Sequence, residues 1–204
     1  MAFRKFKEIG EVLTTFDIVY ESTEFVQLGQ VQLPQTLADE MKYTIKHLPY
    51  KISEAAIGEM IIFPILKEVW RKYDSKLTLW SHKSISFGKD LSGIPDYMIA
   101  TQSKHGMVVL DKPLLAVVEA KKDDFVGGWA QCALEMYTIQ QINTNPQLPV
   151  FGIVSNGDTW EIARLIDKKF IVNTNPFHLA SLDELYASLD FILNECINSI
   201  SLHK

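Results

Sequence analysis

Three residues at the ends of two apolar runs have the types and the spacing of a metal-dependent active site. Asp96 stands at the start of the run at residues 94–101, and Glu119 and Lys121 close the run that ends in VVEAK. Because residues two apart on a strand point to the same face, Glu119 and Lys121 project together and Ala120 turns the other way. Two carboxylates from neighbouring strands can bind one hard cation, and a lysine beside them can orient or activate an attacking water.

We therefore expect Asp96, Glu119 and Lys121 to converge, with carboxylate oxygens about 2.0–2.6 Å from a shared cation. The alternative is an exposed Glu–Lys pair at a strand edge, which contributes almost nothing to stability. The apolar residues before Glu119 favour the site, because a buried central strand does not usually end in an exposed ion pair.

A lone acidic residue lies in the apolar part of a helical segment expected at residues 54–70, with a kink or a new turn at Pro64. Ser53 is expected to cap this helix, and Glu54 in its first turn complements the helix dipole. Between Glu54 and Lys67 the only charge is Glu59, whose helical neighbours are apolar. Because burying an unpaired carboxylate is costly, we expect Glu59 to lie buried near Asp96, compensated by a metal ion or its water. A cap or an ion pair with a basic side chain is the alternative role.

A second amphipathic helix is expected at residues 129–142, after Gly127-Gly128 free the backbone. Its polar stripe consists of Gln131, Glu135 and Thr138. We regard Gln131 as a candidate for the site and Glu135 as a weaker one.

These features together resemble the PD-(D/E)xK nuclease superfamily. The motif is Pro95-Asp96 followed by Glu119-Ala120-Lys121, and the resemblance covers residues 52–165, from the helix with Glu59 to beyond the helix with Gln131. It implies a restriction-endonuclease-like αβββαβ core. The hairpin sequence GIVSNGDTWEIARL also resembles the end of the nuclease domain in type I restriction enzyme motor subunits.

The resemblance implies a role for each candidate residue. Asp96, Glu119 and the carbonyl of Ala120 bind Mg²⁺ or Mn²⁺, Glu59 contacts the metal or its water, Lys121 acts on the attacking water, and Gln131 tunes the site. The expected function is divalent-metal-dependent hydrolysis of phosphodiester bonds in nucleic acid, with DNA as the expected substrate. The alternative is a non-catalytic module on the same fold that binds nucleic acid or another subunit.

One departure from the family leaves its branch open. Some branches place a tyrosine four residues after the glutamine, whereas this chain has Glu135 there and Tyr137 two residues later. A role in processing DNA ends is therefore not assigned.

The pattern of the chain predicts one α/β (α+β) domain over residues 1–204, with a mixed central sheet flanked by helices. Residues 1–50 form an N-terminal elaboration, with a strand at 14–20 and a helix at 34–48, and the core occupies 52–165. Core strands are expected at 77–87 and 94–101, in a run ending at Lys121, and at 149–154 and 158–165 around the Asn156-Gly157 turn. A capping box at Ser181 and Glu184 starts a C-terminal helix at 181–202.

Composition sets the remaining expectations. The 204 residues are 47% hydrophobic and 22% charged, which are values typical of a globular protein. The net charge of −5 is weak evidence against nucleic-acid binding, because a local basic rim can coexist with a negative total. The absence of an apolar run of transmembrane length predicts a soluble cytoplasmic protein without a membrane partner. The two cysteines are expected to be free and buried, and the five histidines lack the spacing of a zinc site. Action as a homodimer or with a partner subunit stays open.

Overall fold

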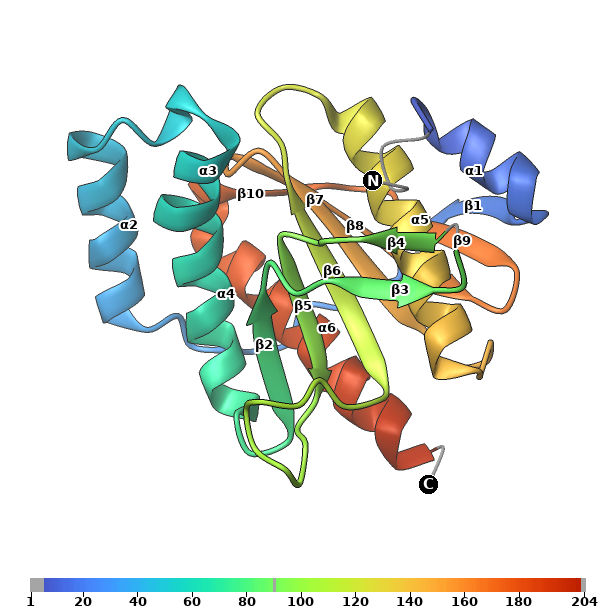
Figure 1. Cartoon of the computed structure of the whole chain (residues 1–204). Helices are drawn as coiled ribbons and strands as arrows, with labels where there is room; N and C mark the ends of the chain where they lie inside the picture. The colour runs from blue at the N-terminus through green and yellow to red at the C-terminus, as the bar shows by residue number, and fades with distance from the viewer. Residues whose placement is uncertain (1–5, 90, 203–204) are drawn as a thin grey trace.

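A mixed sheet runs through the middle of the molecule, and helices cover both of its faces (Figure 1). The structure, a computed structural model, describes residues 6–89 and 91–202. Within these residues the main sheet has eight strands in the order β1-β9-β8-β7-β6-β5-β2, with β10 paired to β8. The pairs β1–β9 and β6–β7 are parallel and the other pairs are antiparallel. The predicted α/β class, a mixed sheet flanked by helices, is therefore confirmed.

The strands of this sheet are short, and the central ones are the most apolar. They are β1 (Val19–Thr23), β2 (Leu77–Ser81), β5 (Tyr97–Thr101), β6 (Leu114–Ala120), β7 (Val150–Ser155), β8 (Thr159–Ile166), β9 (Lys169–Asn173) and β10 (Phe177–His178). Every residue of β6 and β7 is buried. This is the usual composition of parallel strands that are covered on both faces.

One face of the sheet is covered by a nearly continuous helix together with two further helices. The first consists of α3 (Glu54–Ile57), the π-helical segment η3 (Gly58–Ile62) and α4 (Phe63–Trp70), and it packs with α2 (Gln35–His47) and α6 (Leu182–Leu202) into one apolar cluster. Short 3₁₀ turns, η2 (Tyr50–Ile52), η4 (Arg71–Tyr73) and η5 (Leu179–Ser181), join these helices to their neighbours. Pro64 has no N–H to donate, and the wide π turn lies directly before it, where Phe63 N–H donates to Gly58 O.

The other face is covered by α5 (Phe125–Asn143), against which α1 (Ile9–Phe16) packs. The ring of Phe16 stacks on Tyr137 of α5, with the ring centroids 4.1 Å apart. The predicted strand at 14–20 is therefore wrong in its first half, because Phe16 is drawn into a helix that packs against α5. Only from Val19 does the chain join the sheet, beside β9.

Two other predicted elements need correction. The strand predicted at 77–87 ends at Ser81, because His82 has a left-handed backbone (φ 50°), and the chain then forms a separate pair, β3 (Ile85–Phe87) with β4 (Leu91–Gly93). The helix predicted at 129–142 begins earlier, at Phe125, because Asp124 caps it by accepting a hydrogen bond from Gly127 N–H at 2.8 Å.

The remaining elements agree with the sequence. The chain order is α3 to α4, β2, β5, β6, α5 and β7, with β3–β4 inserted, and α6 begins directly after Ser181. The Asn156-Gly157 turn joins β7 to β8, with Gly157 at φ 86°. Cys132 and Cys196 are free and buried. In the part of the chain described, no helix has both the length and the apolar character needed to cross a bilayer.

The packing of α5 on β7 generates a stability prediction. A Cβ atom at Gly152 would lie 2.3 Å from Met136 Sδ and 2.8 Å from Cys132 Sγ, and both of these side chains are fully buried. Gly152→Ala should therefore lower the free energy of unfolding by about 1–3 kcal/mol, measured by urea denaturation. Gly10→Ala is the control, since a Cβ there meets no atom within 4 Å and alanine favours a helix. Equal stability of Gly152→Ala and the wild type would contradict the described packing.

Candidate active site

The candidate site forms where β6 leaves the core. Glu119 is completely buried, and Lys121 follows the strand, with Lys121 N–H donating to Ser155 O at 2.8 Å. Lys121 Nζ lies 3.1 Å from Glu119 Oε2, and its side chain is only 12% exposed. Ala120 turns to the opposite face and packs toward Gly58. The alternation predicted from the sequence therefore places a carboxylate and an ammonium together inside the protein.

Asp96 joins this pair from the neighbouring chain segment. Its register is one residue beyond the pair Tyr97–Val118, which places it opposite Glu119. Asp96 Oδ2 accepts a hydrogen bond from Ala120 N–H at 2.8 Å, and Asp96 N–H lies 3.4 Å from Glu119 Oε1, a long contact. The structure thus brings Asp96, Glu119 and Lys121 together, as expected from the sequence.

Helix α5 adds two polar side chains to the network. Lys121 Nζ donates to Gln131 Oε1 at 3.2 Å, and Gln131 Nε2 donates to Glu135 Oε1 at 3.2 Å. Glu135 is completely buried, and its carboxyl group also forms a side-chain hydrogen bond with that of Glu119. Gln131 and Glu135 therefore both contact the site directly, Gln131 at Lys121 and Glu135 at Glu119.

Burial controls the protonation of this network. Burial raises the pKa of Glu119 to about 7, and the charge of Asp96 adds to this effect, while the hydrogen bond with Glu135 and the charge of Lys121 oppose it. Burial also raises the pKa of Glu135 well above its ordinary value, and Glu119 raises it further. For Lys121, burial opposes the charged form, but the attraction of Glu119 outweighs it and raises the pKa. The ammonium is thus retained at neutral pH, whereas the two buried carboxyl groups bind protons readily.

Glu59 does not occupy the buried position that was predicted for it. It is exposed, because Ile61 and Ile62 of the π segment take the inward positions and turn Glu59 outward. The expectation of a buried lone carboxylate is therefore wrong. Its proximity to Asp96 is retained, since both line a cavity of about 230 Å³, whose lining consists of Glu54, Ala55, Gly58, Glu59, His82, Asp96, Tyr97 and Ala120.

Close packing of the helix on β5 keeps this cavity beside Asp96. The Tyr97 hydroxyl approaches Gly58 so closely that a Cβ there would lie 2.9 Å from it. Burial raises the pKa of Tyr97 to about 12, with Asp96 and Glu59 adding to the effect, so the phenol remains neutral. Gly58 is thus the residue that lets the acidic helix approach the end of the sheet.

The sequence analysis missed the position of Glu54. This residue lines the first cavity and also a second one of about 480 Å³, which is formed with Phe6, Lys7, Lys121, Asp124, Gly127 and Gln131. The signal was present, because Ser53 caps the helix by accepting a hydrogen bond from Ala56 N–H at 3.1 Å and so fixes Glu54 in the first turn. The sequence analysis interpreted Glu54 only as a complement to the helix dipole.

His82 is a second residue that the sequence analysis did not assign. Its N–H donates to Asp96 O at 2.9 Å, and its Nε2 lies 3.6 Å from Asp96 Oδ1. No sequence signal points to it, because its place depends on the left-handed backbone that ends β2.

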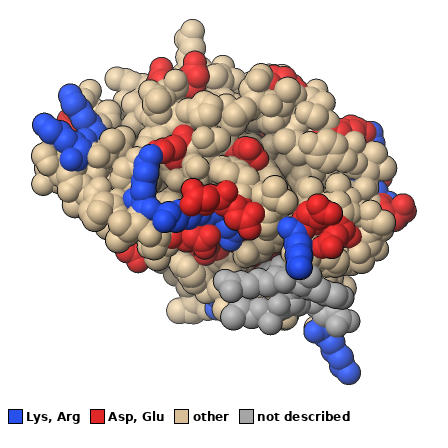
Figure 2. Space-filling model, turned by 90° about the horizontal axis from the view of Figure 1, so that it is seen from above, with Lys and Arg blue, Asp and Glu red and all other residues tan. Residues whose placement is uncertain are grey.

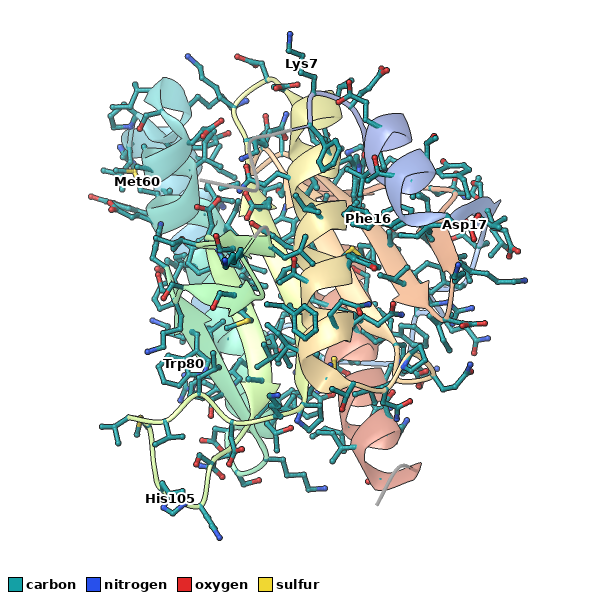
Figure 3. The ribbon with its side chains drawn as sticks, turned by 45° about the vertical axis from the view of Figure 1, so that its right-hand side comes forward. Lys7, Phe16, Asp17, Met60, Trp80 and His105 are labelled. Carbon is teal, nitrogen blue, oxygen red and sulfur yellow. The ribbon has the colours of Figure 1, made fainter. Side chains whose placement is uncertain are left out.

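The two cavities open at one end of the sheet. Figure 2, which looks onto this end, shows several acidic side chains in the middle of the face, with basic side chains among them. Figure 3 shows Lys7, which lines the second cavity, at this end and His105 at the opposite one. Among residues 6–89 and 91–202, no group of three or more His, Cys, Asp and Glu side chains is arranged to hold a metal ion together.

Comparison with known proteins identifies no relative. No family model, no curated protein and no solved structure matches the chain. The geometry and the chemistry of the site therefore carry the functional argument.

The buried carboxyl groups predict how stability depends on pH in metal-free buffer. The pKa of Glu119 is raised from 4.5 to about 7 in the folded state, so its stabilising contribution is complete below about pH 4.5 and is lost as the pH rises through about 7. The thermal midpoint should fall between about pH 5 and about pH 8 in EDTA. Glu135→Gln removes one of the two buried acids and should make this fall smaller.

The matched control is Glu40→Gln, which changes an exposed glutamate of α2 and should keep the wild-type pH dependence. Differential scanning calorimetry of the three proteins measures the effect. A wild-type midpoint that rises over this pH range would contradict the assigned protonation.

Proposed function

We propose that this chain is a divalent-metal-dependent nuclease that hydrolyses phosphodiester bonds in nucleic acid, with DNA as the expected substrate. The observation that carries the proposal is the buried Glu119 carboxylate, with the Lys121 ammonium 3.1 Å away and Asp96 on the adjacent strand end. A surface ion pair does not explain this arrangement, because Glu119 has no exposed area. Burying these charges is costly unless the site uses them.

The order of the elements supports the fold that belongs to this proposal. A helix, the three strands β2, β5 and β6, the helix α5 and the parallel strand β7 follow one another in the chain. This order agrees with the αβββαβ core of the proposed restriction-endonuclease-like fold, in which Asp96 and Glu119 would be the acids at the strand ends. The inserted pair β3–β4 and the N-terminal strand β1 are additions to it.

The donor set fits a hard cation. Asp96 and Glu119 supply carboxylate oxygens, Ala120 supplies a backbone carbonyl beside them, and Glu54 and Glu59 line the adjoining cavity. Mg²⁺ is usually held by one or two carboxylates together with waters, so a group of three protein acids is not required. When bound, Mg²⁺ or Mn²⁺ would neutralise charge that develops on the phosphoryl oxygens.

The side chains of this network can position the attacking water. Lys121 Nζ is held between Glu119 Oε2 and Gln131 Oε1, so its position is fixed, and its remaining hydrogen can point toward the second cavity. An ammonium held in this way orients a water and stabilises negative charge in the transition state. Gln131 is a positioning residue in this scheme, and Glu135 orients its amide.

A second function has one observation in its favour. Asp96 Oδ2 and Glu119 Oε2 both accept hydrogen bonds from the protein itself, and no group of three metal-binding side chains is present in the described residues. A module on the same fold that binds nucleic acid or a partner subunit without cutting would tolerate such satisfied acids. Metal binding without turnover would favour this second function.

Two substitutions separate metal binding from catalysis. Lys121→Ala should lower cleavage by at least about a hundredfold while Mn²⁺ affinity is retained, because the lysine acts on the water and not on the metal. Loss of the positive charge should even strengthen metal binding. Asp96→Ala should weaken Mn²⁺ binding itself, because it removes a ligand. Isothermal titration with Mn²⁺ and cleavage of single- and double-stranded DNA and RNA, with EDTA as the blank, measure both effects.

Lys122→Ala is the control, since Lys122 is exposed and adjacent in the chain. It should cleave like the wild type. Cleavage by Lys121→Ala at the wild-type rate would reject the role of the lysine. If the wild-type protein binds Mn²⁺ but cuts none of the four substrates, the nuclease function is rejected in favour of the non-catalytic module.

A further inference from the structure

A basic segment lies beside the acidic site. The chain from Met41 to Ser53 contains Lys42, Lys46, His47 and Lys51 and no aspartate or glutamate, although the whole protein has a net charge of −5. It comprises the last two turns of α2, the turn η2 and the cap of α3, and Glu54 of the site follows it directly. We call residues 41–53 the basic arm.

The basic arm is well exposed. Lys42, Lys46 and His47 are all exposed, and within the described residues neither Lys42 nor Lys46 forms an ion pair. Lys51 is paired with Asp158. Figure 2 shows a group of basic side chains at the left edge of the face, where Figure 1 has α2, apart from the acidic side chains in the middle. Two ammonium groups without an ion-pair partner in the described residues therefore face solvent on the last two turns of α2.

Aromatic and apolar side chains are interleaved with these charges. Tyr43 is 63% exposed, and its ring lies 4.6 Å from the ring of His47, centroid to centroid. Ile45, Leu48 and Ile52 are also exposed, with Ile52 at 66%. Lysines with an exposed aromatic ring between them suit a flexible polyanion whose flat groups can stack, which describes a single strand of nucleic acid.

We propose that the basic arm binds a single-stranded segment of nucleic acid, with Lys42 and Lys46 on its phosphates and a base stacked on Tyr43. This deepens the proposed function and rests on it, because the arm leads into the cavity of Glu54, Glu59 and Asp96. The acidic middle of the face repels phosphate, so the positive charge that attracts a strand has to lie beside it. A basic helix end alone would only complement the helix dipole, but the exposed Tyr43–His47 ring pair has no part in that role.

Binding is measured without catalysis, in EDTA, by fluorescence anisotropy of a labelled oligothymidylate of about 20 nucleotides. Lys42→Glu/Lys46→Glu should weaken binding by at least about tenfold and lower the slope of log affinity against log salt by about 0.7 for each lost phosphate contact. Tyr43→Ala should cost about tenfold, and Tyr43→Phe should restore wild-type affinity.

The matched control is Lys76→Glu/Lys104→Glu, which makes the same charge change on exposed lysines away from the arm. Lys104 adjoins His105, which lies at the opposite end of the molecule (Figure 3). This control should bind like the wild type. Circular dichroism and thermal midpoints verify that all variants fold, which is expected because every changed side chain is exposed.

Three results would overturn the inference: no binding by the wild type, equal loss in the control, or binding to mixed phosphatidylserine–phosphatidylcholine vesicles in place of the oligonucleotide. A cleavage assay with Mg²⁺ on the same proteins distinguishes this failure from failure of the proposed function. If binding depends on Lys42 and Lys46 but no cleavage is detected, the role of the basic arm is supported and the proposed nuclease function is rejected. If the protein cleaves nucleic acid but the arm variants bind like the wild type, the proposed function is kept and the basic arm is rejected.

Discussion

A fully buried carboxylate at the end of β6 constrains the centre of the molecule. Glu119 lies between otherwise apolar layers, where an unpaired charge would be strongly destabilising. Its neighbours come from three elements: Lys121 after β6, Asp96 before β5 and Glu135 of α5, with Gln131 of α5 bound through Lys121. One polar network thus fixes the ends of two strands and the first turns of a helix relative to one another, next to a core that is mainly apolar.

The parts of the fold that local pattern determines were predictable from the sequence. The apolar runs of β6 and β7, the Asn156-Gly157 turn and the period of α2 each follow from a few adjacent residues. The incorrect predictions lie where contacts between residues far apart in the chain determine the local structure. Phe16 becomes helical because it stacks on Tyr137, which is more than a hundred positions away in the chain, and β2 stops where His82 bonds to Asp96. Neither partner can be identified from the neighbourhood of the residue itself.

The same distinction between local pattern and distant contacts separates the site residues that could be predicted from those that could not. Strand alternation is local, so the common side of Glu119 and Lys121 could be derived from spacing alone. The choice between Glu54 and Glu59 depends on the phase of the helix across the π turn, which is set by Pro64 and by the approach of Tyr97 to Gly58. A regular α-helix would have placed Glu59 on a different side of the helix, and no pattern in the sequence predicts the wider π turn.

The distribution of charge adds a final constraint on what this end of the sheet can bind. A cavity lined by Asp96, Glu54 and Glu59 concentrates negative potential, and low-dielectric walls strengthen it. Such a cavity attracts cations and repels phosphates, so a phosphodiester can approach only when a cation occupies it or when positive charge nearby compensates. Lys121 supplies a fixed charge of this kind inside the protein, and the exposed lysines of the basic arm add positive charge at its surface. Because exposed charges are screened within about 8 Å at physiological salt, the lysines of the basic arm act on a strand where they contact its phosphates and not through a long-range field.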